Sequence, residues 1–388
     1  ATRIDRAGLI VKGRENLLVQ SNSFSTSPWA VSGTTLTGGQ TGYDGSNDAW
    51  LLTKTASAFL YLYQNISLSG VQSFSVYAKA GSLNIATLYI NATSNYYIKF
   101  SLVDGSVIEQ SNTGAIINTN AEDVGNGWYR LSVTISDSIT RVRIYPDFTE
   151  TTAGNILIQD AQLEQGLAAS PYIESGATNG TAGVLENTPR LNYTTGVANP
   201  YLLLEPSRTN FTDSSEYAGL WAGINANITT TNNATTSPEG VDNAVKLEGL
   251  TTSSSNQIVN FGSTILNGVN VIGKTYTASV YLKPVNPSDV GDDITLSIQR
   301  NSGDYEGLNL IFEIDSADWK RYDLTYAFTG AGAGDQVGVL FKILRSDTTI
   351  DDIYVYGVQL EEGSYPTSYI PTYSVSATRA YDYIKYID

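Results

Sequence analysis

The sequence predicts an all-β protein made of two tandem antiparallel β-sandwich domains of the jelly-roll type, joined by an extended, hairpin-like linker. Three observations predict this fold. Strand-like segments alternate apolar and polar residues, and several phrases recur in the same order in the two halves of the chain. In addition, no window of about ten residues carries the apolar spacing of an amphipathic helix.

The strand-like segments are rich in Val, Ile, Thr and Tyr, which favour strands whose two faces meet different surroundings. Clusters of Gly, Asn, Asp and Ser separate them at short intervals, as turns require. Many short strands of this kind predict antiparallel sheets packed face to face. The clearest segments are residues 73–80, 129–136, 141–146, 155–163, 274–283, 320–328 and 352–360.

The repeated phrases indicate a duplication. "AQLEQGLAASPYI" from Ala161 matches "VQLEEGSYPTSYI" from Val358, and "DGSNDAWLL" matches "EGVDNAVKL". "FSVYAKAG" likewise matches "ASVYLKPV", and Asn16 near the start matches Asn210. The distance between the copies is that of a whole domain and too long for a solenoid repeat. We therefore expect homologous modules at residues 15–175 and 206–372.

Three further segments complete the predicted organisation. Residues 1–14 form an N-terminal extended segment, and residues 176–205 form an extended linker with two runs around a Thr-Gly turn. Three prolines in and just after this linker argue for edge positions outside a regular ladder. Residues 373–388 form a strand-like tail that we expect to pair with a partner chain.

Composition excludes much common chemistry. The chain has no Cys and no His, which removes thiol nucleophiles, Ser-His-Asp triads and imidazole metal ligands. Its net charge is −16 with 22 Lys and Arg, so we expect no nucleic-acid partner. No apolar run is long enough for a spanning helix, so we expect no membrane insertion. The chain lacks an initiator Met, and we expect a fragment or a processed product.

Several phrases in fixed order carry a resemblance to a known module. They are "NLLVQSNSFSTSPW", "GNGWYRLSVT", "VQLEEGSYPTSYIPT" and above all "NTPRLNYTTGVANPYLLLEPSRTN". Over nearly the whole chain, the sequence resembles a recurrent module of tailed-bacteriophage virion proteins, found in tail-fibre, head-fibre and decoration components. This module in turn resembles carbohydrate-binding jelly rolls of the xylanase-accessory type. The resemblance implies a virion-surface or extracellular location and other virion proteins as partners.

Tyrosine and tryptophan side chains are the candidates for glycan binding, because sugars stack on flat aromatic faces. Tyr61 and Tyr63 fall on one side of a strand by alternation, and the other candidates are Trp50, Tyr96 and Tyr97. The remaining tryptophans fall in the repeated phrases, and we expect them in the cores. They are Trp29, Trp128, Trp221 and Trp319.

Calcium is the cofactor that the sequence leaves open. The carbohydrate-binding relatives often hold a structural calcium with an Asp in the last strand, and the resemblance carries this role to Asp160. Its counterpart in the second module is Gly357. The loops Asp44–Asp48 and Asp289–Asp293 are dense in oxygen donors, so Asp44 and Asp48 are further candidate ligands, although Asx turns explain both loops equally well.

Catalysis is not expected, and no catalytic residue is assigned. Two carboxylate pairs, Asp304 with Glu306 and Glu313 with Asp315, have the spacing of neighbours on one strand face. An acidic chain contains such pairs by chance, and the first module has no equivalent pair.

The sequence therefore predicts a non-enzymatic virion structural and adhesion protein whose modules bind bacterial-surface or environmental polysaccharide. We expect a homo-oligomer because multivalency strengthens weak glycan binding, and the resemblance to fibre proteins implies a trimer as one form. Two alternatives remain open: a purely structural virion protein with protein contacts only, and the accessory carbohydrate-binding part of a polysaccharide-degrading enzyme.

Overall fold

The computed structural model describes residues 2–111, 113–185, 188–193, 199–253, 255–261, 270–300, 306–330 and 338–382. The chain divides into two compact units. The first sandwich is Arg14–Gly183, and the second sandwich combines Ala1–Gly13 with Val184–Asp388. Each is described by itself.

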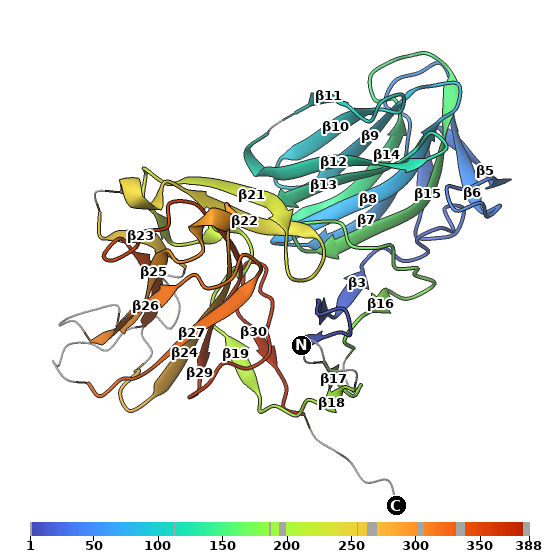
Figure 1. Cartoon of the computed structure of the whole chain (residues 1–388). Coiled ribbons are helices and arrows are strands. Elements are labelled where there is room, and N and C mark those ends of the chain that lie inside the picture. The colour runs from blue at the N-terminus through green and yellow to red at the C-terminus, as the bar shows by residue number, and fades with distance from the viewer. Residues whose placement is uncertain are drawn as a thin grey trace, which may run out of the picture. The chain divides into compact units, whose positions relative to one another are not determined.

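The first sandwich consists of two six-stranded antiparallel sheets, seen as the blue-to-green ribbons of Figure 1. One sheet has the order β11-β10-β9-β14-β7-β4 and the other the order β12-β13-β8-β15-β6-β5. The strands are β4 (Ala30–Ser32), β5 (Thr34–Gln40), β6 (Ala49–Lys54), β7 (Tyr61–Leu68), β8 (Val71–Ala80), β9 (Ile85–Asn91), β10 (Asn95–Ser101), β11 (Val107–Gln110), β12 (Ile116–Gly125), β13 (Trp128–Ser136), β14 (Ile139–Pro146) and β15 (Gly154–Gln165). A short pair, β3 (Arg14–Asn16) with β16 (Gly180–Ala182), joins the two ends of this unit.

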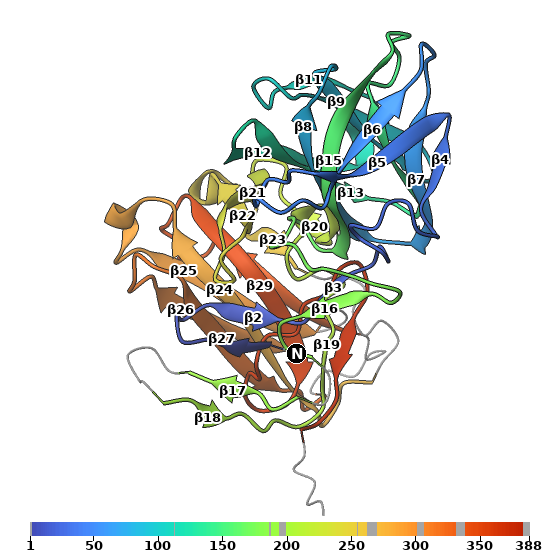
Figure 2. The same ribbon diagram turned by 90° about the vertical axis from the view of Figure 1, so that its right-hand side faces the viewer.

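The second sandwich has two five-stranded antiparallel sheets, with the orders β20-β23-β28-β25-β26 and β21-β22-β29-β24-β27. Three two-stranded pairs accompany them: β1 with β2, β17 with β18, and β19 with β30. Figure 2 shows β17 and β18 side by side. The strands are β1 (Thr2–Ile4), β2 (Ile10–Lys12), β17 (Leu191–Asn192), β18 (Tyr201–Leu202), β19 (Arg208–Asn210), β20 (Gly223–Ile224), β21 (Thr229–Thr236), β22 (Asp242–Glu248), β23 (Gln257–Asn260), β24 (Thr275–Pro284), β25 (Asp293–Arg300), β26 (Gly307–Glu313), β27 (Lys320–Ala327), β28 (Val339–Leu344), β29 (Ile353–Glu362) and β30 (Ala377–Arg379).

The helices in the described part of the chain are short 3-10 turns at Thr113–Ala115, Ala218–Leu220, Leu250–Thr252 and Pro287–Asp289. The prediction of an all-β fold with two antiparallel sandwiches is therefore confirmed. No helix among the described residues has the length and apolar character needed to cross a membrane.

Each sandwich is closed by an apolar core between its two sheets. Alternation explains how the core forms, because Val142 and Ile144 in β14 and Leu62 in β7 point inward and are fully buried. Three of the tryptophans expected in the cores are buried, and Trp319 is half-buried against a smaller apolar cluster. The core prediction is confirmed for Trp29 and Trp221, whereas Trp128 is buried in a separate small cluster with Ala49 and Tyr77.

The repeated Q-L-E phrase is explained by one hydrogen-bond network built twice. In the first sandwich, buried Asn16 donates through Nδ2 to the carbonyls of Ala161 and Ile173 at 3.1 and 2.9 Å. Its Oδ1 accepts from the backbone N–H groups of Leu18 and Leu163, both at 3.1 Å. These bonds tie the entry of the module to its closing strand.

The second sandwich repeats this arrangement. Asn210 donates to the carbonyls of Val358 and Ile370 at 3.1 and 2.8 Å, and accepts from the N–H groups of Thr212 and Leu360 at 3.1 Å. The phrase therefore recurs because each copy closes one sandwich.

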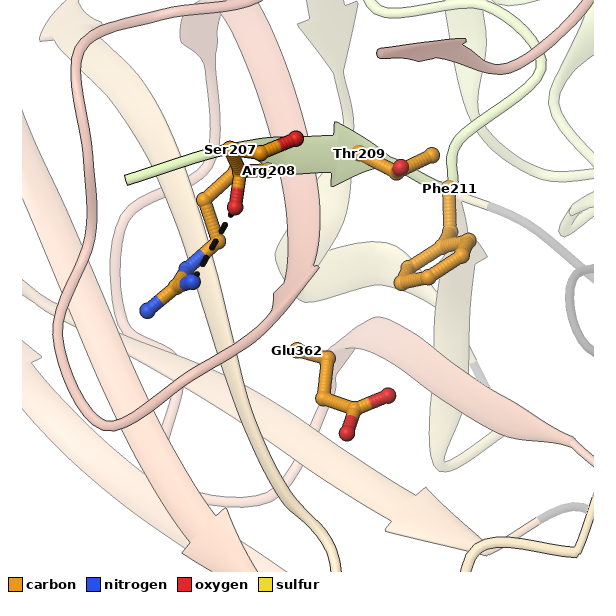
Figure 3. A pocket seen from close by; sticks show the side chains of 5 residues that line it. All are labelled: Ser207, Arg208, Thr209, Phe211 and Glu362. Carbon is orange, nitrogen blue, oxygen red and sulfur yellow. Dashed lines mark hydrogen bonds between the residues drawn. The ribbon is translucent and has the colours of Figure 1, made fainter. Parts of the chain in front are cut away.

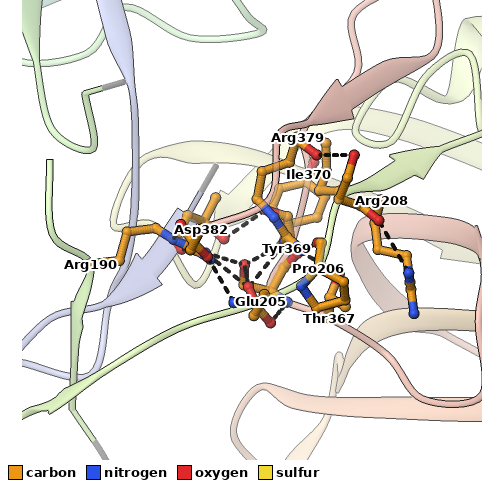
Figure 4. Close-up of polar contacts among 12 residues, drawn as sticks. Arg190, Glu205, Pro206, Arg208, Thr367, Tyr369, Ile370, Arg379 and Asp382 are labelled. Carbon is orange, nitrogen blue, oxygen red and sulfur yellow. Dashed lines mark hydrogen bonds and ion pairs between the residues drawn. The ribbon is translucent and has the colours of Figure 1, made fainter. Parts of the chain in front are cut away.

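The linker is held to the second sandwich by an ionic network (Figure 4). Arg190 lies 2.9 Å from Glu205 and also pairs with Asp382, while Arg379 lies 3.0 Å from the same Glu205. Both arginine side chains are almost fully buried. Within this linker, β17 and β18 form the hairpin that the Thr-Gly turn predicts. The last six residues of the predicted tail, 383–388, lie outside the described residues.

The N-terminal segment contributes a buried cation to the second sandwich. Lys12 Nζ lies 3.0 Å from Glu216 Oε1 and 2.9 Å from Glu239 Oε2, and these side chains are 4%, 1% and 1% exposed. Burial raises the pKa of Glu216, and the ammonium of Lys12 opposes that rise. The second sandwich is therefore built from two separate stretches of the chain.

Candidate functional site

The outer face of one sheet in the first sandwich gathers aromatic and cationic side chains. In β7, inward Leu62 and Gln64 are buried while Tyr61 and Tyr63 alternate with them and remain half-exposed. Alternation in β14, β9 and β10 presents further polar and aromatic side chains on the same side. We call this surface the aromatic face.

Strand register aligns four of these side chains in one row. Tyr63 of β7 is the cross-strand partner of Arg143 of β14, and Arg143 is also the partner of Tyr89 of β9. Tyr89 is in turn the partner of Tyr97 of β10. Since neighbouring strands lie about 4.8 Å apart, the row extends over roughly 14 Å.

The two arginines on this face stack on tyrosine rings. The guanidinium carbon of Arg143 lies 4.5 Å from the ring centre of Tyr61 and 5.0 Å from that of Tyr89. The guanidinium carbon of Arg141 lies 4.6 Å from the ring centre of Tyr63. Cation–π contacts hold these planar cations against the sheet.

The rings of Tyr145 and Phe148 pack against the tyrosines of the aromatic face. Tyr145 is buried, and its ring centre lies 4.9 Å from that of Tyr61. Its hydroxyl oxygen accepts from Arg143 Nη1 at 2.9 Å, and burial raises its pKa to about 12. The ring centre of Phe148 lies 5.3 Å from that of Tyr89 and 4.9 Å from that of Tyr97. The rings thus support one another and fix the orientation of the row.

A polar row flanks the aromatic one. Register places Asn65, Arg141, Asn91 and Asn95 side by side across β7, β14, β9 and β10. Arg141 Nε donates to Asn65 Oδ1 at 2.6 Å, and Asn91 Nδ2 donates to Asn95 Oδ1 at 2.7 Å. Amide groups beside flat rings are what sugar hydroxyls need as donors and acceptors.

Three buried polar atoms of this sheet have no hydrogen-bond partner among the described residues. They are Arg143 Nε, Asn91 Oδ1 and Thr87 Oγ1, from the adjacent strands β14 and β9. Buried polar groups are normally hydrogen-bonded, so these three atoms are unsatisfied positions beneath the surface of this sheet.

The opposite edge of the face is closed by a charged pair. Tyr97 Oη donates to Glu109 Oε1 at 2.5 Å, and Lys99 Nζ lies 3.0 Å from Glu109 Oε2. The hydrogen bond from Tyr97, followed by that from Lys99, lowers the pKa of Glu109. The negative charge of Glu109 is therefore compensated by Lys99.

The aromatic face brings together three of the five glycan-binding candidates, namely Tyr61, Tyr63 and Tyr97. Tyr96 points into the core, is 4% exposed and donates to Asp137 Oδ2 at 2.8 Å. Its ring is not available to a ligand. Trp50 belongs to β6 of the other sheet, where its indole N–H donates to the carbonyl of Asn22 at 2.9 Å.

The sequence reading missed other members of the face, although a signal for some was present. Alternation in "RVRIYP" places Arg141, Arg143 and Tyr145 on one side of a strand. What local sequence does not give is the neighbour of each strand, so the row through Tyr89 could not be assembled. Phe148 lies beyond the end of β14 and carries no alternation signal.

The candidate calcium ligands lie near one another at the other sheet. Gln159 Nε2 donates to Asp44 Oδ1 at 3.3 Å and to Asp48 Oδ1 at 2.8 Å, and Tyr43 Oη donates to Asp160 Oδ2 at 3.2 Å. Burial raises the pKa of Asp160 to about 7, and the nearby Asp48 and Asp44 add to the effect. Among the described residues, no three His, Cys, Asp or Glu side chains form a group that could hold a metal ion. Calcium binding by Asp44, Asp48 and Asp160 stays a prediction.

Two members of the predicted carboxylate pairs, Glu306 and Asp315, have partners within the protein. Asp315 pairs with Lys320 and accepts from Tyr322, while Glu306 accepts from the backbone of Thr329 and lies 3.3 Å from Arg300. Asp304 lies outside the described residues.

A separate pocket of about 260 Å³ occurs in the second sandwich (Figure 3), and it is lined by Ser207, Arg208, Thr209, Phe211 and Glu362. The guanidinium of Arg208 lies 5.8 Å from the ring centre of Tyr365, and its Nε lies 3.8 Å from Glu361. Glu362 lies 3.0 Å from Lys274. The pocket is smaller than typical ligand sites, and its charges are engaged within the protein.

No known protein-family model matches this chain, and no curated protein matches it. Among solved structures, it is similar to the tandem CBM22-1–CBM22-2 domain of Xyn10C from Paenibacillus barcinonensis. Identity is 14%, 91% of this chain and 99% of that chain are covered, and the TM-score is 0.29.

Two further solved structures show a similar level of likeness. The tandem CBM51 modules of a family 98 glycoside hydrolase from Streptococcus pneumoniae SP3-BS71 share 11% identity over 94% of this chain and 96% of that chain, with a TM-score of 0.21. Tailspike protein 4 of bacteriophage CBA120 shares 16% identity over 38% of this chain and 21% of that chain, with a TM-score of 0.25. The fold class stated above rests on the strands and sheets of this chain itself.

Proposed function

We propose that this chain is a non-enzymatic, glycan-binding component of a bacteriophage particle, and that the aromatic face of the first sandwich binds surface polysaccharide. The observation that carries the binding role is the row Tyr63, Arg143, Tyr89 and Tyr97. The virion role and its extracellular location rest on the resemblance of the linker and the repeated phrases.

The geometry suits an extended saccharide. A strip of roughly 14 Å, made of rings on adjacent strands, offers several stacking positions for sugar C–H groups. The polar row beside it supplies hydrogen-bond partners for sugar hydroxyls. Because the rings of Tyr145 and Phe148 already hold the tyrosines in place, little side-chain entropy is lost on binding. A broad half-exposed strip of this kind binds an internal stretch of a polymer more readily than it encloses a single sugar.

The test is binding of the full chain to a panel of bacterial-surface and plant polysaccharides, measured by affinity electrophoresis and then calorimetry. Replacing Tyr89 by Ala at the centre of the row removes one stacking position. It should weaken binding by about 1 to 2 kcal/mol, or roughly 5- to 30-fold in Kd. Tyr365→Ala, an exposed tyrosine of the second sandwich, is the matched control and should leave Kd unchanged. Equal binding by both variants would show that the ligand lies elsewhere.

The proposal includes assembly into a homo-oligomer through the linker hairpin. Leu191 and Leu202 are cross-strand partners in β17 and β18, and each is 42% exposed. Leu204 nearby is 50% exposed. Adjacent exposed leucines are typical of surfaces that bury against another chain. Multivalent presentation would then strengthen weak glycan contacts.

A further inference from the structure

We propose that the aromatic face selects an anionic polysaccharide, one whose sugars carry an oxyanion that binds Arg143 and Arg141. This inference rests on the proposed function, because it names the ligand class of the same face.

The charge of this face is opposite to that of the chain. The protein has 38 acidic and 22 basic residues, yet β14 presents two arginines at the middle of the sheet. The two rows contain two charged side chains, Arg141 and Arg143. The edge of the face adds Lys99 and Glu109. Because the charges of Lys99 and Glu109 compensate each other, the net positive charge of the aromatic face comes from the two guanidinium groups.

Neither arginine is paired with a carboxylate in the described part of the chain. Arg143 donates from Nη1 to a neutral tyrosine hydroxyl, and Arg141 donates from Nε to a neutral amide. Other arginines without a carboxylate partner among the described residues, namely Arg130, Arg321 and Arg345, donate to backbone carbonyls instead. In a protein with many carboxylates, two adjacent cations without one indicate that their counter-charge comes from outside.

The orientation of the guanidinium groups suits an oxyanion. Arg143 is held between the rings of Tyr61 and Tyr89, and these contacts fix the orientation of its guanidinium group. Arg141 and Arg143 are two positions apart on one strand, so both present N–H groups on the same side. A guanidinium binds carboxylate or phosphate oxygens through paired N–H donors, and it does so more strongly beside low-dielectric rings than in open water.

Neutral sugars remain the alternative for the same face, since guanidinium groups also donate to hydroxyls. Binding of an anionic sugar and binding of a neutral sugar differ in how the affinity depends on the charge of the ligand. Selection for an oxyanion requires tighter binding of the charged form of one polymer than of its neutral form, and it requires weakening by salt. Stacking of a neutral sugar requires neither.

The experiment compares three forms of one oligosaccharide on the full chain. An oligogalacturonide, its carboxyl-reduced neutral form and the phosphorylated derivative of that neutral form are titrated by calorimetry at about 0.05 M and about 0.5 M salt. We expect at least one charged oligomer to bind about tenfold or more tighter than the neutral form at low salt, with the difference shrinking at high salt. Which charged oligomer binds tells whether the oxyanion is a carboxylate or a phosphate.

Variants then locate the effect. Arg143→Gln should abolish the preference for the charged form while leaving residual stacking, and Arg143→Lys should retain part of it. Arg6→Gln, an exposed arginine of the N-terminal segment, is the control and should have no effect. The comparison of ligand forms on the unaltered protein keeps the test valid even if Arg143→Gln lowers stability.

The outcomes separate this inference from the proposed function. Equal binding of the charged and neutral forms, weakened in both by Tyr89→Ala, would overturn the charge selection and leave glycan binding intact. Absence of binding to the oligomers and to the whole polysaccharide panel would overturn the proposed function and the inference with it.

Discussion

Replacing Lys12 by Met should destabilise the second sandwich strongly, although Lys12 lies at the far N-terminal end of the chain. The substitution keeps the apolar stem and removes the ammonium that lies 3.0 Å from Glu216 and 2.9 Å from Glu239. Two buried carboxylates would then face each other without a counter-charge. Breaking a buried ion pair on one side costs about 3 to 5 kcal/mol.

This cost can be converted into a melting temperature. For a unit of roughly 200 residues, each kcal/mol shifts the Tm by about 2 to 4 °C, so the second sandwich should melt roughly 6 to 20 °C lower. Differential scanning calorimetry measures this shift, with the melting of the first sandwich as internal reference. Lys274→Met is the matched control, because Lys274 and Glu362 are 38% and 46% exposed and such pairs contribute about 0 to 1 kcal/mol.

The loss should also depend on pH in a defined direction. Burial raises the pKa of Glu216 above its ordinary value of 4.5, and removing Lys12 raises it further. A carboxyl with a raised folded-state pKa favours the folded state at low pH, and this contribution is lost as pH rises. The difference between wild type and variant should therefore be largest near neutral pH and shrink toward pH 4.5. A Tm loss under about 2 °C, or one that is the same at every pH, would refute the reasoning.

Three further predictions concern other parts of the fold. Asn210→Ala removes five buried hydrogen bonds, four of them to backbone groups that are left unpaired, so it should cost about 2 to 4 kcal/mol in urea unfolding of the second sandwich. A cost under about 0.5 kcal/mol would contradict the closing role. The pKa of Asp160 is raised to about 7, so its charged form destabilises the first sandwich as pH rises from about 4 through 7. Asp160→Asn should therefore raise the Tm more at pH 8 than at pH 5. A larger rise at pH 5 would be inconsistent with burial of the charge. Replacing Leu191 and Leu202 together by Ser should lower self-association in sedimentation velocity without changing Tm, and unchanged association would remove the hairpin from the interface.

The sequence predicts most of the architecture because its signals are local or duplicated. Alternation identifies strands such as β8, β13 and β24, and the repeated Q-L-E phrase marks the closing strands β15 and β29. The association of Lys12 with Glu216 is not predictable in this way, because 204 positions separate them and no pattern near Lys12 names its partner. The sequence treats residues 1–14 as a separate extended segment for the same reason.

The candidate site is predictable only in part. Alternation selects Tyr61 and Tyr63 correctly as a pair on one face, but neighbouring Tyr96 and Tyr97 must point to opposite faces, and the pattern alone does not decide which one is buried. The row itself depends on β7, β14, β9 and β10 being adjacent in that order. That order is a property of the whole fold, so Tyr89 and Arg143 become visible as site residues only in the structure.

The central claim is that the aromatic face of the first sandwich binds polysaccharide, and hydrogen exchange tests it most directly. The full chain is exchanged with and without the tightest-bound polysaccharide of the panel at saturation. Our account predicts slower exchange in β7, β9, β10 and β14, with no change in the strands of the second sandwich. Protection confined to the second sandwich, with the four strands of the aromatic face unaffected, would contradict it.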